Sequence, residues 1–126
     1  MATIKAPSMA DRIYIGAAGN LSVAESKVVL AGAAVNDVVE MVEMPIGLKV
    51  VGLRIVTDGL GNNVTVDIKA GNTVLKAGVD VATANATIIP IVPAYLDEKV
   101  PLTATIKGAP ATGELAIMPE YTVIGY

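Results

Sequence analysis

The chain contains neither cysteine nor histidine, and its 126 residues include no tryptophan and no phenylalanine. Without cysteine there is no disulfide, no thiolate nucleophile and no cysteine-ligated metal. Histidine is the usual general acid or base near neutral pH and the commonest metal ligand. Its absence removes the standard parts of catalytic triads, zinc sites and haem sites. We therefore expect a protein that is not an enzyme and that holds no cofactor and no metal.

Charge is also scarce. Charged residues make up 17% of the chain and hydrophobic residues 53%, whereas ordinary soluble domains carry roughly 25% charged residues. This composition excludes global disorder, which needs low hydrophobicity and high net charge. It leaves few charges to cover a free surface, so it favours a protein that hides much of its exterior against neighbouring subunits. The alternative is a monomer that is simply rich in alanine and glycine.

The few basic residues are not clustered. Nine Lys and Arg residues are scattered singly from Lys5 to Lys107, and the net charge is −3. Nucleic-acid binders concentrate basic residues on one face, so we expect no nucleic-acid partner. The first 20 residues lack the apolar core of a signal peptide, and no apolar run reaches about 18 residues. We expect a soluble protein that is made in a cytoplasm and has no membrane partner.

A period of two dominates the pattern, with turn residues every 8–12 positions. Val64, Val66 and Ile68 alternate with Thr65 and Asp67, which is typical of a half-buried strand. The pattern predicts strands at 13–16, 26–31, 36–44, 48–57, 63–70, 73–77, 86–92, 101–108 and 113–124. About eight strands without a convincing helix indicate an all-β sandwich or small barrel in a single domain over residues 13–126. The segment 35–44 also fits helical spacing, but it is short, rich in valine and closed by Pro45.

Two sets of polar residues are candidates for a functional site, one for acid–base catalysis and one for calcium binding. Glu40 and Glu43 lie three apart, which on a regular strand places them on opposite faces rather than in one catalytic pair. The segment 58–63, Asp-Gly-Leu-Gly-Asn-Asn, holds one carboxylate and two amides, whereas calcium requires six to eight oxygen ligands. A Gly/Asn hairpin connection accounts for the same residues.

Two segments are candidates for contact with other subunits. Residues 1–12 show no alternation, and we expect an extended N-terminal arm that lies across a neighbour. The alternative is a frayed terminus. The segment 88–95 is the most apolar run, and its two prolines place it at a sheet edge or end the strand at Pro90. Another subunit or a loop of the same chain must cover such an edge. The predicted interface residues are Ile4, Pro7, Met9, Ile89, Ile91, Val92 and Tyr95.

Two blocks of sequence resemble the small jelly-roll decoration (cement) proteins of tailed-phage heads. Residues 101–121 are similar to the closing hairpin of those proteins, with an Ala-Thr-Gly-Glu-Leu turn leading into a long strand that ends near Glu-Tyr. Residues 50–60, followed by 64–69, are similar to their central hairpin. The resemblance covers about residues 13–124. The low aromatic content and Pro119 within the last strand depart from the pattern.

The resemblance implies a jelly-roll-like antiparallel β-sandwich and a virion protein on the head surface that stabilises contacts between capsomers. Its partners would be the major capsid protein and further copies of itself, as a homodimer or homotrimer. One alternative is a tail or head–tail connector subunit, which would form a ring of fixed number. Another is a carbohydrate-binding module, for which only Tyr14, Tyr95, Tyr121 and Tyr126 could provide exposed aromatic rings.

Overall fold

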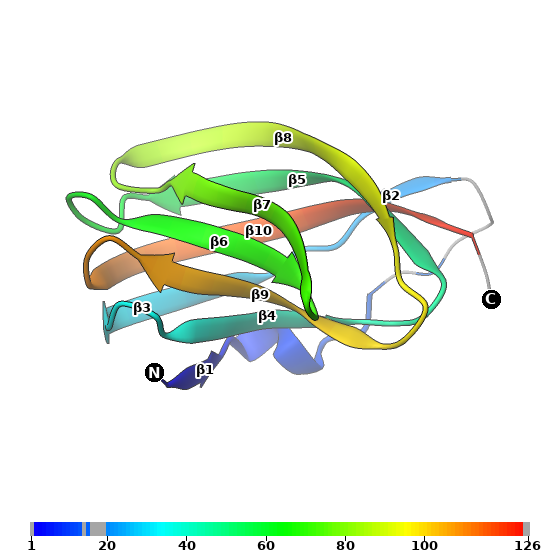
Figure 1. Ribbon diagram of the computed structural model, residues 1–126, viewed down its shortest axis with the longest axis horizontal. Coiled ribbons are helices and arrows are strands. Elements are labelled where there is room, and N and C mark those ends of the chain that lie inside the picture. The colour runs from blue at the N-terminus through cyan, green and yellow to red at the C-terminus, as the bar shows by residue number, and fades with distance from the viewer. Residues whose placement is uncertain (1, 14, 16–19, 125–126) are drawn as a thin grey trace.

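The computed structural model describes residues 2–13, 15 and 20–124, which form two β-sheets packed face to face (Figure 1). These residues contain ten strands and one short 3-10 helix. The elements are β1 (Thr3–Lys5), η1 (Pro7–Ala10), β2 (Leu21–Val23), β3 (Lys27–Ala33), β4 (Val38–Met44), β5 (Leu48–Asp58), β6 (Thr65–Ala70), β7 (Thr73–Asp80), β8 (Ala84–Tyr95), β9 (Val100–Lys107) and β10 (Ala111–Val123). The predicted all-β sandwich is confirmed, and the helical alternative for residues 35–44 is wrong.

The strand order is that of a jelly roll. Sheet A has the order β1-β4-β9-β6-β7, and sheet B has the order β2-β10-β5-β8, with β3 also paired to β10. If β3 to β10 are counted as eight successive strands, the two sheets read 1-8-3-6 and 2-7-4-5, the arrangement of two interlocked Greek keys. β1 is an addition at one edge of sheet A. It pairs with β4 in parallel, the one departure among the described strands from the antiparallel pairing that we expected.

Most connections between successive strands pass from one sheet to the other. β5 belongs to sheet B and β6 to sheet A, so the predicted central hairpin is wrong, and residues 59–64 form an arch between the sheets. The predicted closing hairpin is wrong for the same reason, because β9 and β10 lie in different sheets. Within the described chain, the tight turn at Gly71 joins the one hairpin, β6–β7. Gly and Asn residues mark a reversal of the chain, and they do so equally for hairpins and for arches.

The alternating apolar residues of both sheets meet in one core. The largest fully buried side chains include Leu53, Leu115, Ile117 and Tyr121 of sheet B and Met41, Ile68, Leu102 and Ile106 of sheet A. β4 interrupts the alternation, because Met41 and Val42 are both buried where the register against β9 shifts. This bulge turns Glu40 and Glu43 to the same outer side of sheet A. Our prediction that these two carboxylates lie on opposite faces is therefore wrong.

Pro119 sits in the middle of sheet B, and a break in the neighbouring strand accommodates it. β2 ends at Val23 and β3 begins at Lys27, so residues 24–26 run beside this part of β10 without forming a regular ladder. The Ile117 amide donates to Ser26 O at 3.0 Å and the Ala24 amide donates to Pro119 O at 3.2 Å. Backbone groups two residues apart on a strand point the same way, so the missing N–H of Pro119 faces this break.

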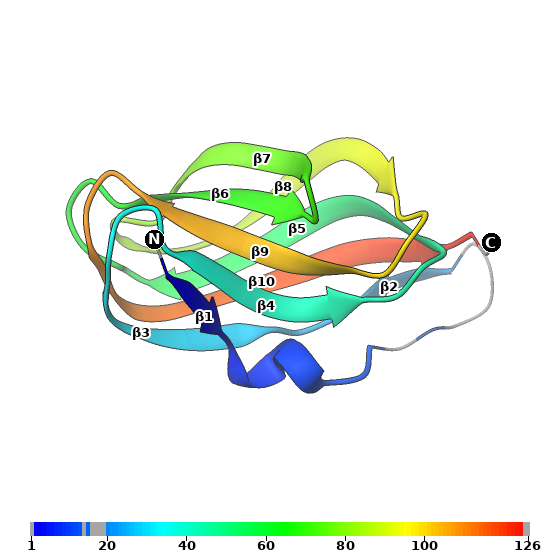
Figure 2. The ribbon, with the colours of Figure 1, turned by 60° about the horizontal axis from the view of Figure 1, so that its bottom comes forward.

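The N-terminal segment packs against its own sandwich (Figure 2). β1 runs beside β4, and η1 follows it along the side formed by β4 and β3. Ala6 is buried, and its amide donates to Glu40 O at 2.9 Å. The Ser8 hydroxyl donates to Met41 O at 2.6 Å and accepts a hydrogen bond from the Lys27 amide at 3.3 Å. The contact of residues 1–12 with a neighbouring subunit stays a prediction.

The predicted strand at 13–16 is wrong at the residues that can be described. Ile13 and Ile15 belong to no strand, and residues 14 and 16 lie outside the described part of the chain. The structure adds β1 and β2, which sequence alternation did not reveal because each is only three residues long.

Candidate interaction surface

The outer face of sheet A is polar. On β6, Thr65, Asp67 and Lys69 face outward because the residues between them are buried. Strand pairing places Lys107, Thr105 and Thr103 of β9 beside these three, in that order. A sheet with one face in the core and the other in water has this alternation of apolar and polar residues.

The outer face of sheet B is largely apolar instead, and strand register arranges its residues in rows. Ala86 of β8 pairs with Val56 of β5, which pairs with Ala116 of β10. In the next row Ile88 pairs with Arg54, and Arg54 with Met118. Val56 is 40% exposed and Ile88 is 56% exposed, so these side chains lie on the surface rather than in the core. We call Val56, Ala86, Ile88, Ala116 and Met118 the sheet B patch.

The sheet B patch continues toward the ends of the strands. Val29, Leu21 and Val23, on strands β3 and β2, are exposed on the same face. Isolated apolar residues on a surface are normal, whereas a contiguous apolar patch marks a site of interaction. The contrast between the two sheets therefore singles out the outer face of sheet B.

The charged residues beside the sheet B patch form two ion pairs. Arg54 Nε donates to Glu120 Oε2 at 2.8 Å, and the ammonium group of Lys27 lies 3.9 Å from Glu114 Oε2. Both are pairs between neighbouring strands, so they leave the centre of the face nearly neutral. A neutral apolar surface loses less hydration free energy on burial than a surface that carries unpaired charges.

A shallow depression of about 470 Å³ lies at the centre of the sheet B patch. It is lined by Arg54, Val56, Ala86, Thr87, Ile88 and Met118. The small side chain of Ala86, between the larger Val56 and Ile88, leaves this space open. The depression therefore suits an apolar side chain from a partner rather than a polar ligand.

β8 forms an edge of sheet B, as the prolines at 90 and 93 predicted. It pairs with β5, and none of its twelve residues is charged. From Ala84 to Pro90 the pairing with β5 is regular, but residues 91–93 lie opposite Val51 alone and make a bulge. Val92, in this bulge, is 88% exposed. The proline-containing half of β8 is therefore unsuited to further strand pairing, whereas the half from Ala84 to Ile89 is suited to it.

The predicted interface residues differ in exposure and lie on two sides of the sandwich. Ile4, Ile89 and Ile91 are partly buried against the protein's own core, and Met9 is half-buried. Pro7, Val92 and Tyr95 are exposed. The structure thus brings Ile89, Ile91, Val92 and Tyr95 together on β8, and it places Ile4, Pro7 and Met9 at the opposite side of the sandwich. Their contact with another subunit stays a prediction.

Sequence reasoning missed Val56 and Met118 at the centre of the sheet B patch. It included Ile88 in the candidate segment 88–95 but not among the named interface residues. Alternation places Ile88 and Ile89 on opposite faces, but it does not say which of the two faces outward. Val56 follows Ile55 in a run of apolar residues with the same ambiguity. Strand register, which the sequence does not specify, supplies the answer.

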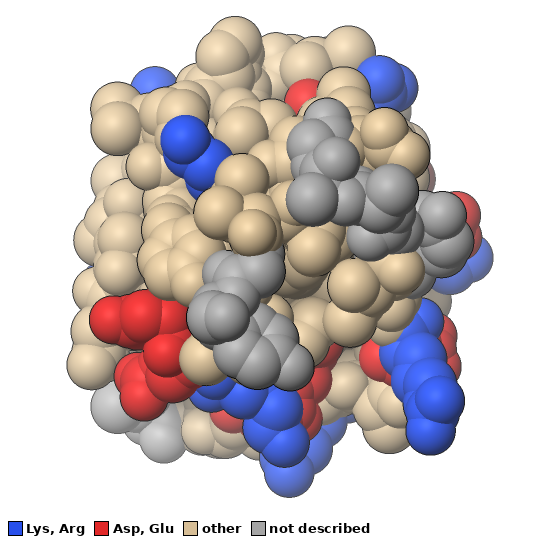
Figure 3. Space-filling model, turned by 90° about the vertical axis from the view of Figure 1, so that its right-hand side faces the viewer, with Lys and Arg blue, Asp and Glu red and all other residues tan. Residues whose placement is uncertain are grey.

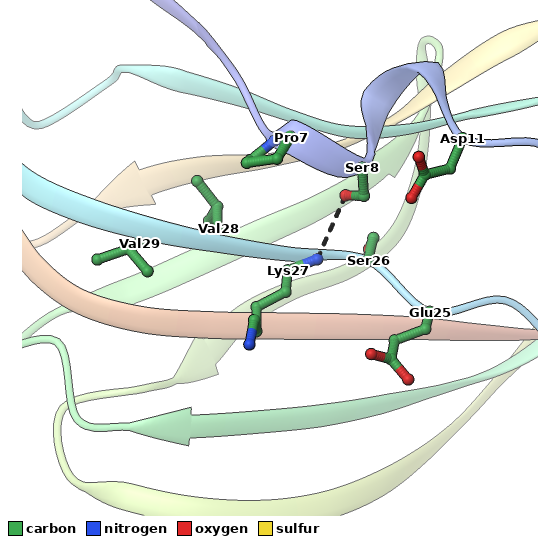
Figure 4. Close-up of a pocket in the computed structure, with 8 residues that line it drawn as sticks. All are labelled: Pro7, Ser8, Asp11, Glu25, Ser26, Lys27, Val28 and Val29. Carbon is green, nitrogen blue, oxygen red and sulfur yellow. Dashed lines mark hydrogen bonds between the residues drawn. The ribbon is translucent and has the colours of Figure 1, made fainter.

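A second depression, of about 390 Å³, lies between η1 and β3 (Figure 4). Pro7 and Ser8 form one side of it and residues 25–29 the other, with the hydrogen bond from Lys27 to Ser8 crossing it. The carboxylates of Asp11 and Glu25 lie at one end. Because the hydrogen bond ties the two walls together, this depression is part of the N-terminal packing.

The described residues hold no cluster of three or more His, Cys, Asp or Glu side chains that could bind a metal. The Asp58 carboxylate accepts a hydrogen bond from the Glu114 amide at 2.9 Å and so fastens the arch of residues 59–64 to β10. Glu43 forms an ion pair with Lys99 at 2.9 Å, which raises the pKa of Lys99.

Most charged atoms at one end of the molecule lie in its lower half, on the side of β1 and β4, and the upper half is mainly uncharged (Figure 3).

Two of the four tyrosines can be placed. Tyr121 is fully buried, so it cannot stack on a sugar, whereas Tyr95 is 45% exposed on β8. Tyr14 and Tyr126 lie outside the described residues. No helix among the described residues is long and apolar enough to cross a membrane.

Comparison with solved structures connects this fold to phage capsids. The chain matches no protein-family model and no curated protein sequence. It is similar in structure to a chain in the capsid of Ralstonia phage GP4, with a TM-score of 0.75, 18% identity, and coverage of 98% of this chain and 99% of that one. A chain of the cyanophage Pam1 capsid gives 0.70 and 15%, with coverage of 93% and 94%. A chain of the acid-stable capsid of Helicobacter pylori bacteriophage KHP30 gives 0.57 and 16%, with coverage of 86% and 92%.

Proposed function

We propose that this chain is a structural protein of a bacteriophage virion and that it decorates the outer surface of the head. The observation that carries the proposal is the end-to-end correspondence with a chain of the Ralstonia phage GP4 capsid, in which nearly all of each chain is matched. Jelly rolls serve many functions, so the fold alone does not assign one. The scarcity of charge and the apolar outer face of sheet B supply the second support.

The difference between the outer faces of sheet A and sheet B supports an orientation of the protein on the head. Sheet A, with its Thr, Lys and Asp side chains, would face the solution. Sheet B, with the sheet B patch at its centre, would lie against the major capsid protein. Burial of apolar area contributes about 25 cal/mol per Å², and a stable interface covers about 800 Å² per partner. Association costs consume much of this free energy, so each contact would be moderate in strength.

Repetition would make such moderate contacts effective. A protein that touches more than one capsomer gains from effective concentration, because release requires all of its contacts to open together. This mechanism needs area and shape but no reactive side chain, which agrees with a chain that has no cysteine and no histidine. Made in the host cytoplasm, the protein would join the virion through its surface alone.

Copy number in purified virions tests this proposal against a connector or tail subunit. Quantitative gel analysis should find the chain in numbers comparable with those of the major capsid protein, and immunogold labelling should mark the whole head. The few copies of a single ring, with label confined to one vertex or to the tail, would contradict the decoration role. Absence from the virion would contradict the structural role altogether.

A further inference from the structure

We infer that two copies of this chain pair through the first half of β8, antiparallel, with Thr87 of each copy on a two-fold axis. This inference concerns the free protein in solution, and it does not depend on the proposed role on a phage head. It rests on the free edge of β8, on the order of side chains along that edge, and on the depression beside it.

The first half of β8 is the one stretch of edge strand in the described sheets that is both regular and uncharged. The edge strand β1 has three residues, and β7 carries Lys76 and Asp80 and pairs with β6 through two register shifts. The β2–β3 edge is broken at residues 24–26. Exposed edges of regular, uncharged strands join other strands unless something covers them.

The order of side chains on β8 is complementary to its own reverse. Pairing about Thr87 places Ile88 of one copy opposite Ala86 of the other, and it does so twice because of the two-fold axis. A large side chain then faces a small one in both halves. Ala86 lines the depression on the sheet B patch, so Ile88 of the second copy would lie at its rim and fill part of it. Thr87 would face Thr87, a pair that is favourable across strands.

Neighbouring registers are less favourable. A two-fold axis at Ala86 would place Ile88 of the second copy opposite Ala84, which pairs with Asp58, and would bring an apolar side chain beside a carboxylate. An axis at Ile88 would place Pro90, which has no N–H, opposite Ala86 inside the new ladder, whereas the axis at Thr87 places it opposite Ala84, where β8 begins and the ladder ends. The uncharged β8 also brings no like charges together when it meets its own copy.

Because the chain has no native cysteine, a single introduced cysteine reports on this geometry directly. Paired positions across antiparallel strands have Cβ atoms about 5 Å apart, so Thr87→Cys should form a disulfide-linked dimer under mild oxidation. Val35→Cys, in the connection between β3 and β4, is the control, because Val35 is 40% exposed and lies on the side of the sandwich opposite β7 and β8. Equal cross-linking of both variants, or none at Thr87→Cys, would contradict the inference.

Light scattering during size-exclusion chromatography measures the association itself. The native chain should have twice the mass of its 12.8 kDa monomer, and Ile88→Lys should raise the dissociation constant about 100-fold because it introduces an unpaired charge into the interface. Val35→Lys should leave the constant unchanged, and circular dichroism should show both variants folded. If Ile88→Lys does not fold, the Thr87→Cys cross-link decides. A native chain that stays monomeric up to about 100 μM, where a dissociation constant of micromolar order would give dimers, would overturn the inference, as would a trimer.

Discussion

The carboxylate of Glu120 lies directly over Gly52, so that a Cβ atom on that glycine would come within 2.5 Å of Glu120 Oε1. The absence of a side chain at this point of β5 gives Glu120 the space to reach Arg54, at 2.8 Å. A glycine in a strand interior usually weakens the strand. Here it permits the ion pair that neutralises the centre of the outer face of sheet B.

We therefore expect Gly52→Ala to displace Glu120 and break its ion pair with Arg54. Because the displaced atoms are the end of a flexible side chain, the free energy of unfolding should fall by less than about 1 kcal/mol. A double-mutant cycle with Arg54→Met and Glu120→Gln should give a coupling energy of about 0.5 kcal/mol in the native background. In the Gly52→Ala background the coupling should vanish, and an unchanged coupling energy would contradict this account.

At a second glycine, Gly108, the structure has no space for a side chain. A Cβ atom on Gly108 would lie 2.0 Å from Asn63 O, and the residue has φ +85°. Gly108→Ala should therefore destabilise the fold by about 4 kcal/mol or prevent folding. Gly78→Ala is the matched control, because Gly78 also has a positive φ (+67°) but no atom lies within 4 Å of its ideal Cβ position. Its cost should be about 1 kcal/mol. Urea denaturation measures both, and equal costs would contradict the steric explanation.

Acid should release the N-terminal strand before the sandwich unfolds. The Asp37 carboxylate accepts hydrogen bonds from the amides of Ala2 and Ala34, both at 2.9 Å, and these bonds lower the pKa of Asp37 below its ordinary value of 3.8. A lowered pKa in the folded state means that the stabilisation is present above pH 3.8 and is lost as the pH falls through the folded pKa. β1 begins next to Ala2, so this loss loosens β1.

Hydrogen exchange at the Ala2 and Ala34 amides measures this effect. Their protection, corrected for the intrinsic pH dependence of exchange, should fall at low pH before that of a core amide such as Ile117. Asp37→Asn should lose the pH dependence and show weakened protection at neutral pH, because an amide offers one acceptor oxygen instead of two. Simultaneous loss of protection at Ala34 and Ile117 would contradict a separate release of β1.

The strands that the sequence predicted well are those in which alternation is long. β5, β6, β9 and β10 each bury every second residue over most of their length, and this periodicity is visible without any structure. β1 and β2 are too short to show a period. The bulge at Met41 and Val42 reverses the faces of the residues after it, which is why the prediction for Glu40 and Glu43 failed.

The candidate surface was predicted only in part. Two prolines identified β8 as an edge, because proline lacks the donor that an interior strand needs. The sheet B patch depends instead on which strands are neighbours, since Ile88, Val56 and Met118 come from three strands that are far apart in sequence. Arches and hairpins share their turn residues, so the sequence did not reveal the sheet to which each strand belongs.

The central claim is that the outer face of sheet B binds a phage head, and co-sedimentation with undecorated heads tests it most directly. The native chain should sediment with the heads and make them more resistant to heat. Val56→Lys places a charge in the sheet B patch away from the β8 edge, and it should reduce binding at least tenfold. Thr105→Lys, on the polar face of sheet A, should bind like the native chain. Equal binding by the two variants, or no binding by the native chain, would contradict the claim.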